Sequence, residues 1–236
     1  MAWYVFALVD AIPSGRAGRG LTGALSIRRI AGAFAIVERR ADVPPMEFGS
    51  LKKHQEVVGR IASRVPAILP VRFGTLLESA DLEESVRDRD EEIAEAFDLV
   101  RDRVQFTWRR QVRGARGKAE GALRETRGAR RADGDSTSET RADQPTSGAE
   151  YLRQAARAAA PAPPAAFRAL GATLGPLVAA RRYQPGTAVL AEAVYHLIEK
   201  KHVTRYLAAA DSLKTSSPAL VMSGPWPPFA FAPEIL

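Results

Sequence analysis

Strand-like and helix-like segments follow one another in nearly the same order in both halves of the chain. The apolar residues of the expected strands alternate or run continuously, whereas those of the expected helices recur every three or four positions. In the first half, strands are expected at Trp3–Val9, Ala24–Ile30, Ala33–Arg39 and Ala67–Val71, and helices at Phe48–Arg64 and Asp81–Arg101. This order is close to the ferredoxin-like βαββαβ pattern, with a glycine-rich loop at residues 11–22 in place of the first helix.

The second half repeats the order strand, helix, strand, strand, helix, strand. Its expected strands are 103–112, 181–183, 189–199 and 219–222, and its expected helices are 165–180 and 203–213. Helix propensity competes for 189–199, but the β-branched and aromatic residues there and the preceding turn favour a strand. We therefore predict an α+β fold of two modified ferredoxin-like domains, residues 1–102 and 103–236. Strand 103–112 is expected to have one face exposed to water.

Charge is concentrated in one segment. The chain of 236 residues has a formal net charge of +7. Residues 109–131 hold nine Arg or Lys and two Glu, so the rest of the chain is balanced. Residues 114–147 contain a single large apolar residue, Leu123, and cannot bury enough surface to offset their chain entropy. We expect a disordered basic insert there, and a tail rich in proline and aromatic residues at the C-terminus.

Several function classes lack their sequence signals. There is no cysteine, which excludes disulfides and thiolate metal sites. No apolar run approaches the ~20 residues of a membrane span, and the N-terminus does not resemble a signal peptide. The glycine-rich loop has neither Walker nor Rossmann spacing, so a mobile loop is expected rather than a phosphate site.

Three histidines are the main candidates for chemistry. His54 lies on the apolar stripe of an expected helix, where a hydrogen-bonded, half-buried role is expected. His196 and His202 are six residues apart across a strand–helix junction, a spacing that favours no ligand geometry. No serine lies in a nucleophile elbow, and paired glutamates such as Glu83 and Glu84 are expected on a solvated helix face. We predict no catalytic, cofactor-binding or metal-binding residue, and no enzymatic activity.

A proline-flanked strand at the centre of the first half ends in an arginine. Ile68, Leu69 and Val71 are typical of a short buried strand, and the prolines on either side limit it to an edge position, because proline has no N–H to donate. Packing alone does not require Arg72. It is expected to pair with a carboxylate near the end of the sheet or, alternatively, to hold two domains together or contact a partner. Gly74 then permits a turn.

Two motifs resemble the gas vesicle protein GvpF/GvpL family. Leu69-Pro70-Val71-Arg72-Phe73-Gly74-Thr75 is similar to its central motif, and residues 223–231, Ser-Gly-Pro-Trp-Pro-Pro-Phe-Ala-Phe, to its C-terminal signature. The opening strand, residues 104–108, the Gly148/Tyr151/Leu152 spacing and residues 193–198 are also similar. Phe229 stands where the family usually has tyrosine, the insert is unusually long, and residues 53–56 are offset from the commoner His-Glu pair.

The resemblance implies two modified ferredoxin-like domains and an accessory or minor structural role in gas vesicle assembly, in the cytoplasm and at the gas vesicle. It implies binding to the small apolar shell protein and to other gas vesicle accessory proteins, with no cofactor, membrane or specific nucleic acid. The partner-binding candidates are Arg72, Phe73, Trp226, Phe229 and Phe231. In the alternative interpretation, the aromatic tail laces the two domains together. A different function, nucleic-acid or general protein binding through the Arg-rich insert, also stays open.

Overall fold

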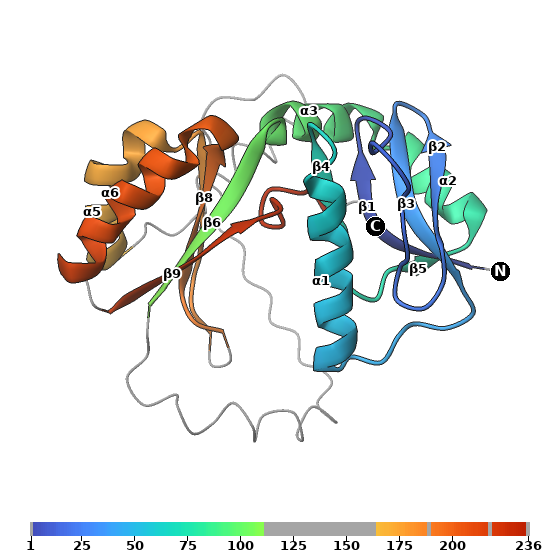
Figure 1. Cartoon of the computed structure of the whole chain (residues 1–236), viewed down its shortest axis with the longest axis horizontal. Helices are drawn as coiled ribbons and strands as arrows, with labels where there is room; N and C mark the ends of the chain where they lie inside the picture. Colours follow the sequence, from blue (N-terminus) through green and yellow to red (C-terminus); the bar gives the residue numbers. More distant parts are fainter. Residues whose placement is uncertain (1, 111–163, 188–189, 217–218, 235–236) are drawn as a thin grey trace, which may run out of the picture.

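The computed structural model describes residues 2–110, 164–187, 190–216 and 219–234. They form an α+β structure with two antiparallel sheets, each part of its own body (Figure 1). The first sheet contains β1 (Ala2–Val9), β2 (Leu25–Ile30), β3 (Ala33–Arg40), β4 (Ile68–Pro70) and β5 (Leu76–Leu77). The second contains β6 (Arg103–Arg110), β7 (Ala180–Gln184), β8 (Ala193–Glu199) and β9 (Leu220–Trp226). The predicted disordered insert and the Gly148/Tyr151/Leu152 spacing lie outside the described residues.

The two sheets have the same strand order. It is β2-β3-β1-β4 in the first, with β5 also pairing with β1, and β7-β8-β6-β9 in the second. β1 is interior and buried on both faces and, as predicted, the proline-flanked β4 is an edge strand. A tight turn joins β2 and β3, with Ala31 in the left-handed region (φ 48°).

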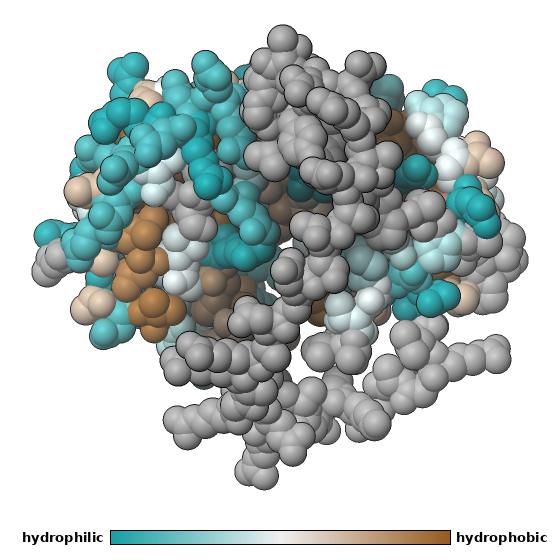
Figure 2. Space-filling model, turned by 180° about the vertical axis from the view of Figure 1, so that it is seen from behind, coloured by the Kyte–Doolittle hydropathy of each residue, from teal (hydrophilic) through white to brown (hydrophobic). Residues whose placement is uncertain are grey.

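Both faces of the first sheet are covered. On one face, α1 (Phe48–Ala62) packs through Val57, Val58 and Ile61 against side chains such as Phe6. The other face is covered by α2 (Ser79–Arg87) and α3 (Asp90–Val100). Figure 2 shows the hydrophilic outer surface of this pair from behind. No helix within the described ranges is both long and apolar enough to cross a membrane.

Within the described residues, helices cover one face of the second sheet. These are α5 (Ala165–Leu174), followed by a 3-10 turn at Gly175–Leu177, and α6 (Val203–Ser216), preceded by a second 3-10 turn at Lys200–His202. Phe106 and Trp108 of β6 lie in the core beneath them. On the opposite face of this sheet, Leu197 of β8 belongs to the same apolar cluster as the buried side chains of α2 and α3. The two bodies therefore share a core.

Asp102, in the link between the two bodies, forms backbone hydrogen bonds with both of them. The Asp102 N–H donates to the Pro66 carbonyl of the first body, and the Asp102 carbonyl accepts from the Lys200 N–H of the second, both at 2.8 Å. Next to it, Arg101 forms an ion pair with Asp10.

The structure corrects several expected boundaries. The single helix predicted at Asp81–Arg101 is two helices, α2 and α3, and Asp81 lies in the first turn of α2. Residues 87–92 are all charged, so no apolar side chain there fixes the helix to the sheet, and the acidic first turn of α3 favours a new N-terminus. The helix predicted at 165–180 ends earlier, at Leu174.

The last strand is longer than predicted and includes part of the expected tail. It continues to Trp226 because Pro225 lies on an edge strand, where a missing N–H costs no ladder bond. The pairing of β6 with β9 shifts register between Gln105 and Thr107. Gly224 (φ 130°) allows this close approach, since a Cβ there would lie 2.8 Å from the Gln105 carbonyl oxygen.

Candidate functional site

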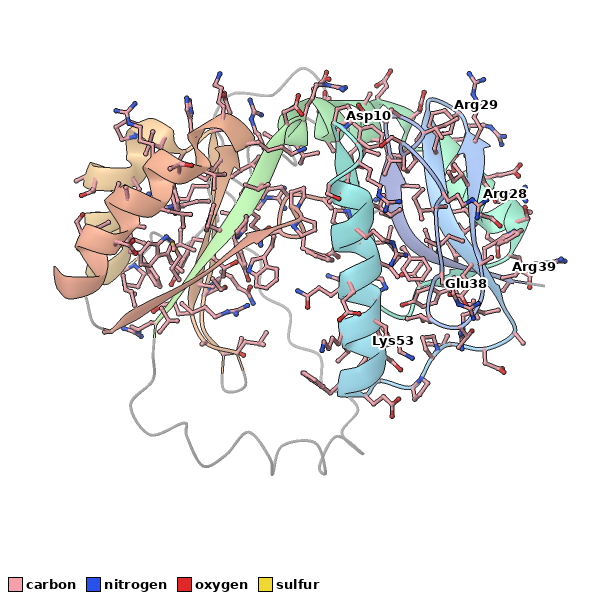
Figure 3. All side chains as sticks on the ribbon, viewed as in Figure 1. Asp10, Arg28, Arg29, Glu38, Arg39 and Lys53 are labelled. Atoms are coloured by element: carbon pink, nitrogen blue, oxygen red, sulfur yellow. The ribbon has the colours of Figure 1, made fainter. Side chains whose placement is uncertain are left out.

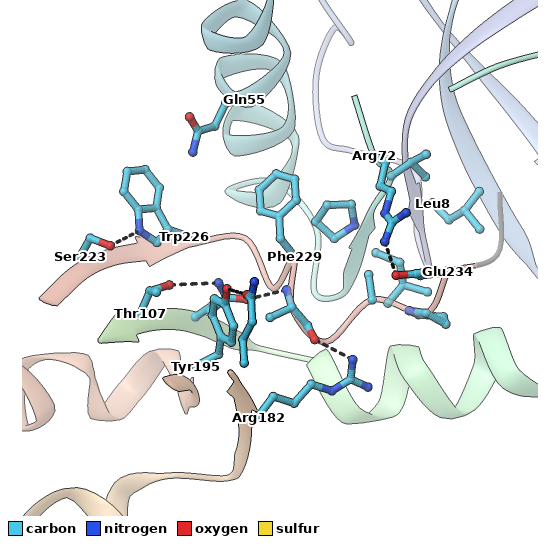
Figure 4. Close-up of a pocket in the computed structure, with 18 of the residues that line it drawn as sticks. Leu8, Gln55, Arg72, Thr107, Arg182, Tyr195, Ser223, Trp226, Phe229 and Glu234 are labelled. Atoms are coloured by element: carbon cyan, nitrogen blue, oxygen red, sulfur yellow. Dashed lines mark hydrogen bonds and ion pairs between the residues drawn. The ribbon is translucent and has the colours of Figure 1, made fainter. Parts of the chain in front are cut away.

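A cleft of about 990 Å³ lies between the two bodies (Figure 4). One wall comes from α1 and from the end of β4 with the residues after it. The floor is the face of the second sheet opposite α5 and α6, and the C-terminal segment, residues 226–234, runs along the cleft. The site is therefore built where the two sheets and the chain end meet.

Two polar side chains on the floor of the cleft are buried. Gln105 and Thr107, on the face predicted to be exposed to water, are buried instead. The Gln105 amide donates to Thr107 Oγ1 (3.3 Å), and its Oε1 accepts the Ala230 N–H (2.7 Å). The strand prediction was right, but its exposed-face interpretation was wrong, because the C-terminal segment covers that face.

The C-terminal segment contacts both bodies. Phe231 is 2% exposed in the shared core, and Phe229 packs against the α1 side of the first body. On the second body, Arg182 donates to the Ala230 carbonyl (2.7 Å) and lies over the Phe231 ring (5.6 Å). On the first body, Arg89 donates to the Glu234 carbonyl (2.8 Å). This arrangement favours the lacing interpretation for the two phenylalanines.

Arg72 forms an ion pair with Glu234 (Figure 4). The predicted carboxylate partner exists, and it comes from the C-terminal segment, so the pair also joins the first body to the chain end. Phe73 is half-buried, with edge contacts to Tyr4 and His54. Trp226 keeps 38% of its surface exposed, with its Nε1–H donating to Ser223 Oγ (3.3 Å). Of the three aromatic candidates in the C-terminal segment, Trp226 is the most accessible.

A buried tyrosine–histidine couple supports the central motif. The Tyr4 hydroxyl lies 2.8 Å from His54 Nδ1, and His54 Nε2 lies 3.2 Å from the Val71 carbonyl, so the ring donates through Nε2 and accepts at Nδ1. The Tyr4 oxygen also accepts the Gly74 N–H (3.2 Å). Burial lowers the pKa of His54 to about 4. The expected hydrogen-bonded role of His54 is confirmed, although its side chain is more deeply buried than expected.

The second body contains a corresponding couple. His196 Nδ1 lies 2.8 Å from the Tyr206 hydroxyl, which accepts the Trp108 Nε1–H at 2.8 Å. The Tyr206 hydroxyl therefore donates its hydrogen bond to His196 Nδ1. Burial, together with the nearby charge of Arg181, lowers the pKa of His196 to about 4, and burial raises the pKa of Tyr206.

The glycine-rich loop encloses a carboxylate of its own chain. Glu38 of β3, 1% exposed, accepts hydrogen bonds from the backbone N–H groups of Leu21, Thr22 and Gly23 and from the Thr22 hydroxyl (Figure 3). Burial alone would raise the pKa of Glu38, but these hydrogen bonds outweigh it and lower the pKa. The loop, expected to be mobile, is thus anchored at residues 21–23, and its nest of N–H groups is occupied by Glu38.

Sequence reasoning missed Glu38 and the exposed start of α1. Gly20 was the available signal for the first, because a Cβ there would lie 2.1 Å from Glu38 Oε2. At the start of α1, the apolar side chains of Met46, Phe48 and Leu51 are exposed. Among the residues that the structure describes, no group of three or more histidines and carboxylates lies close enough to hold a metal ion.

The fold is that of a two-sheet α+β protein with a polar cleft between its bodies. Residues 2–233 match the family model described as gas vesicle synthesis protein GvpL/GvpF, and the chain belongs to this family. A crystal structure of the gas vesicle protein GvpF from Anabaena sp. PCC7120 is similar with a TM-score of 0.66 and 14% identity, covering 98% of this chain and 96% of the other. GvpF from Microcystis aeruginosa is similar with a TM-score of 0.66 and 10% identity, covering 98% and 99%. A comparison with curated proteins gave no match.

Proposed function

We propose that this protein assists gas vesicle assembly by binding the small apolar shell protein, acting with other accessory proteins in the cytoplasm and at the gas vesicle. The observation that carries this proposal is the family match, which spans nearly the whole chain. The repeated strand order supports the interpretation of two modified ferredoxin-like domains that meet at residues 102–103.

The proposed mechanism is transient shielding. An apolar shell subunit outside the vesicle wall exposes surface that aggregates by itself. Trp226 at the cleft offers a rigid aromatic contact with little conformational entropy to lose. In this proposal Phe229 and Phe231 hold the chain end in place, so that Trp226 is presented to the client.

Co-expression with the shell protein tests the proposal. Trp226→Ala should reduce the amount of shell protein that co-purifies, without lowering the melting temperature. Ile12→Ala, which also removes an exposed apolar side chain but lies outside the cleft, is the matched control and should keep full capture. Phe231→Ala should lower the melting temperature, as expected of a core residue. Undiminished capture by Trp226→Ala would contradict a role for this residue in binding.

Nucleic-acid binding has weaker support from the described residues. Base stacking on a sheet requires an exposed aromatic face, whereas both faces of the first sheet are covered by helices or the glycine-rich loop. The Arg-rich insert lies outside the described residues.

A further inference from the structure

The charges that line the cleft are not balanced. Its two carboxylates, Glu92 and Glu234, each have an arginine partner. Arg89 Nη1 lies 3.8 Å from Glu92 Oε2, and Arg72 forms an ion pair with Glu234. In contrast, the Arg109 side chain is exposed and makes no hydrogen bond or ion pair with any described residue. Arg182 contacts a backbone carbonyl and a ring, but no carboxylate among the described residues. Two cations on the floor thus lack an anionic partner.

The wall opposite these cations continues into an apolar stripe. Gln55 of α1 lines the cleft, Leu51 is one turn earlier on the same helix face, and Phe48 precedes Leu51 by three residues. Leu51 is 41% and Phe48 82% exposed. Trp226 of β9 adds an exposed aromatic side chain from the other side of the same cleft (Figure 4). The cleft therefore combines apolar contacts from α1 and Trp226 with positive charge on its floor.

We propose that the cleft binds an amphipathic helix of a partner protein, with apolar side chains against Phe48, Leu51 and Trp226 and carboxylates toward Arg109 and Arg182. A helix fits better than an extended segment because it satisfies its own backbone hydrogen bonds. The two edge strands that reach the cleft, β4 and β9, carry Pro70 and Pro225, which have no N–H to donate to an added strand. The inference rests on the proposed function, since it specifies the chemistry that the client would present.

Two synthetic peptides test the inference on the full-length protein. Both are 16-residue amphipathic helices with the same leucine face, one with glutamate and the other with glutamine on the polar face. The glutamate peptide should bind at least roughly tenfold more tightly in low salt, and most of this preference should disappear in about 0.5 M NaCl. Equal affinity for the two peptides would overturn the inference.

Variants assign the preference to the cleft. Arg109→Glu should remove the preference for the glutamate peptide, and Leu51→Gln should weaken binding of both peptides by a similar factor. Arg205→Glu makes the same charge change at an exposed position of α6, outside the cleft, and should leave the preference intact. If Arg205→Glu were as damaging as Arg109→Glu, net charge would explain the binding and the inference would fail.

Two further outcomes separate the inference from its alternatives. If Trp226→Ala still weakens shell-protein capture while neither peptide is preferred, the proposed function stands and the inference on the cleft fails. If the protein is a dimer that Arg109→Glu dissociates, and no peptide preference is found, the cleft is an interface between copies of this chain and the inference is overturned.

Discussion

The two bodies share a strand order but cover their sheets differently. In the first, helices lie on both faces of the sheet, and the connection from β1 to β2 includes a glycine-rich loop anchored by Glu38. In the second, the described helices lie on one face, and α5 lies on the connection from β6 to β7. The opposite face of the second sheet forms the floor of the cleft. The same strand order can therefore occur in a sheet with helices on both faces or in a sheet that leaves one face available for contact.

The tyrosine–histidine couples show the same contrast. In the first body the strand supplies Tyr4 and the helix supplies His54, and the couple reaches outward to the Val71 carbonyl and the Gly74 N–H. In the second body the roles are exchanged, with His196 on β8 and Tyr206 on α6, and the third partner is the core residue Trp108. The first couple supports a loop at the cleft, whereas the second stabilises a core.

Lowering the pH should destabilise the folded protein through both buried histidines, His54 and His196. Each has a pKa of about 4 in the folded protein against 6.5 as its ordinary value. Between these values the unfolded chain binds more protons, so the free energy of unfolding falls as pH drops from about 6.5 toward 4. At pH 4.5 the loss should be on the order of 2–3 kcal/mol per histidine. Urea unfolding at several pH values between 4.5 and 7.5 measures it.

Single variants divide this pH dependence between the bodies. His54→Asn and His196→Asn should each remove about half of the slope between pH 6.5 and 4.5, and the double variant should remove most of it. A slope that is unchanged in the double variant would show that other groups cause the acid sensitivity.

Removing the hydroxyl of each couple should separate the two bodies further. Tyr206→Phe leaves the Trp108 N–H and His196 Nδ1 without a partner in a closed core, so it should cost about 2–3 kcal/mol of unfolding free energy at pH 7. Tyr4→Phe leaves His54 Nδ1 and the Gly74 N–H without their partner. The Gly74 N–H is only part-buried and water reaches it more easily, so this variant should cost about 1 kcal/mol of unfolding free energy. Urea denaturation compares them.

The matched control for this pair is Tyr195→Phe, whose hydroxyl bonds to Gln184 at the half-buried floor of the cleft. It should change stability least of the three. Equal costs for Tyr4→Phe and Tyr206→Phe would mean that the two couples are buried equivalently and that the proposed contrast is wrong.

Local pattern was enough to predict much of the fold. The positions of β1–β4, β6, β8 and α6 follow from apolar periodicity and turn residues, and the edge position of β4 follows from its prolines. The pattern of the proline-flanked strand identified Arg72 as a residue that packing does not require, and a carboxylate partner near the end of the sheet was expected for it; Glu234 is that partner.

Contacts between distant segments could not be predicted in the same way. Nothing near Glu38 in the sequence indicates that the glycine-rich loop folds over it. Gln105 and Thr107 alternate with apolar residues as on a solvent-exposed strand face, but the C-terminal segment covers them. The cleft itself depends on the relative placement of two bodies, which no periodicity encodes. For the same reason, Phe231 could be identified as a tail aromatic residue but not as a member of the shared core.

The smallest effect is expected at the Arg72–Glu234 pair, where the chain end of the second body meets the first. Both side chains are more than 70% exposed, so water and salt screen the attraction, and the coupling energy in a cycle of Arg72→Gln and Glu234→Gln should be below about 1 kcal/mol. Thermal unfolding of the four proteins measures it. The apolar burial of Phe231 and the hydrogen bonds to the Ala230 backbone remain in every variant, and we expect them to keep the segment attached. A coupling energy above about 2 kcal/mol would reverse this assignment, because the ion pair rather than the buried aromatic residue would then join the two bodies.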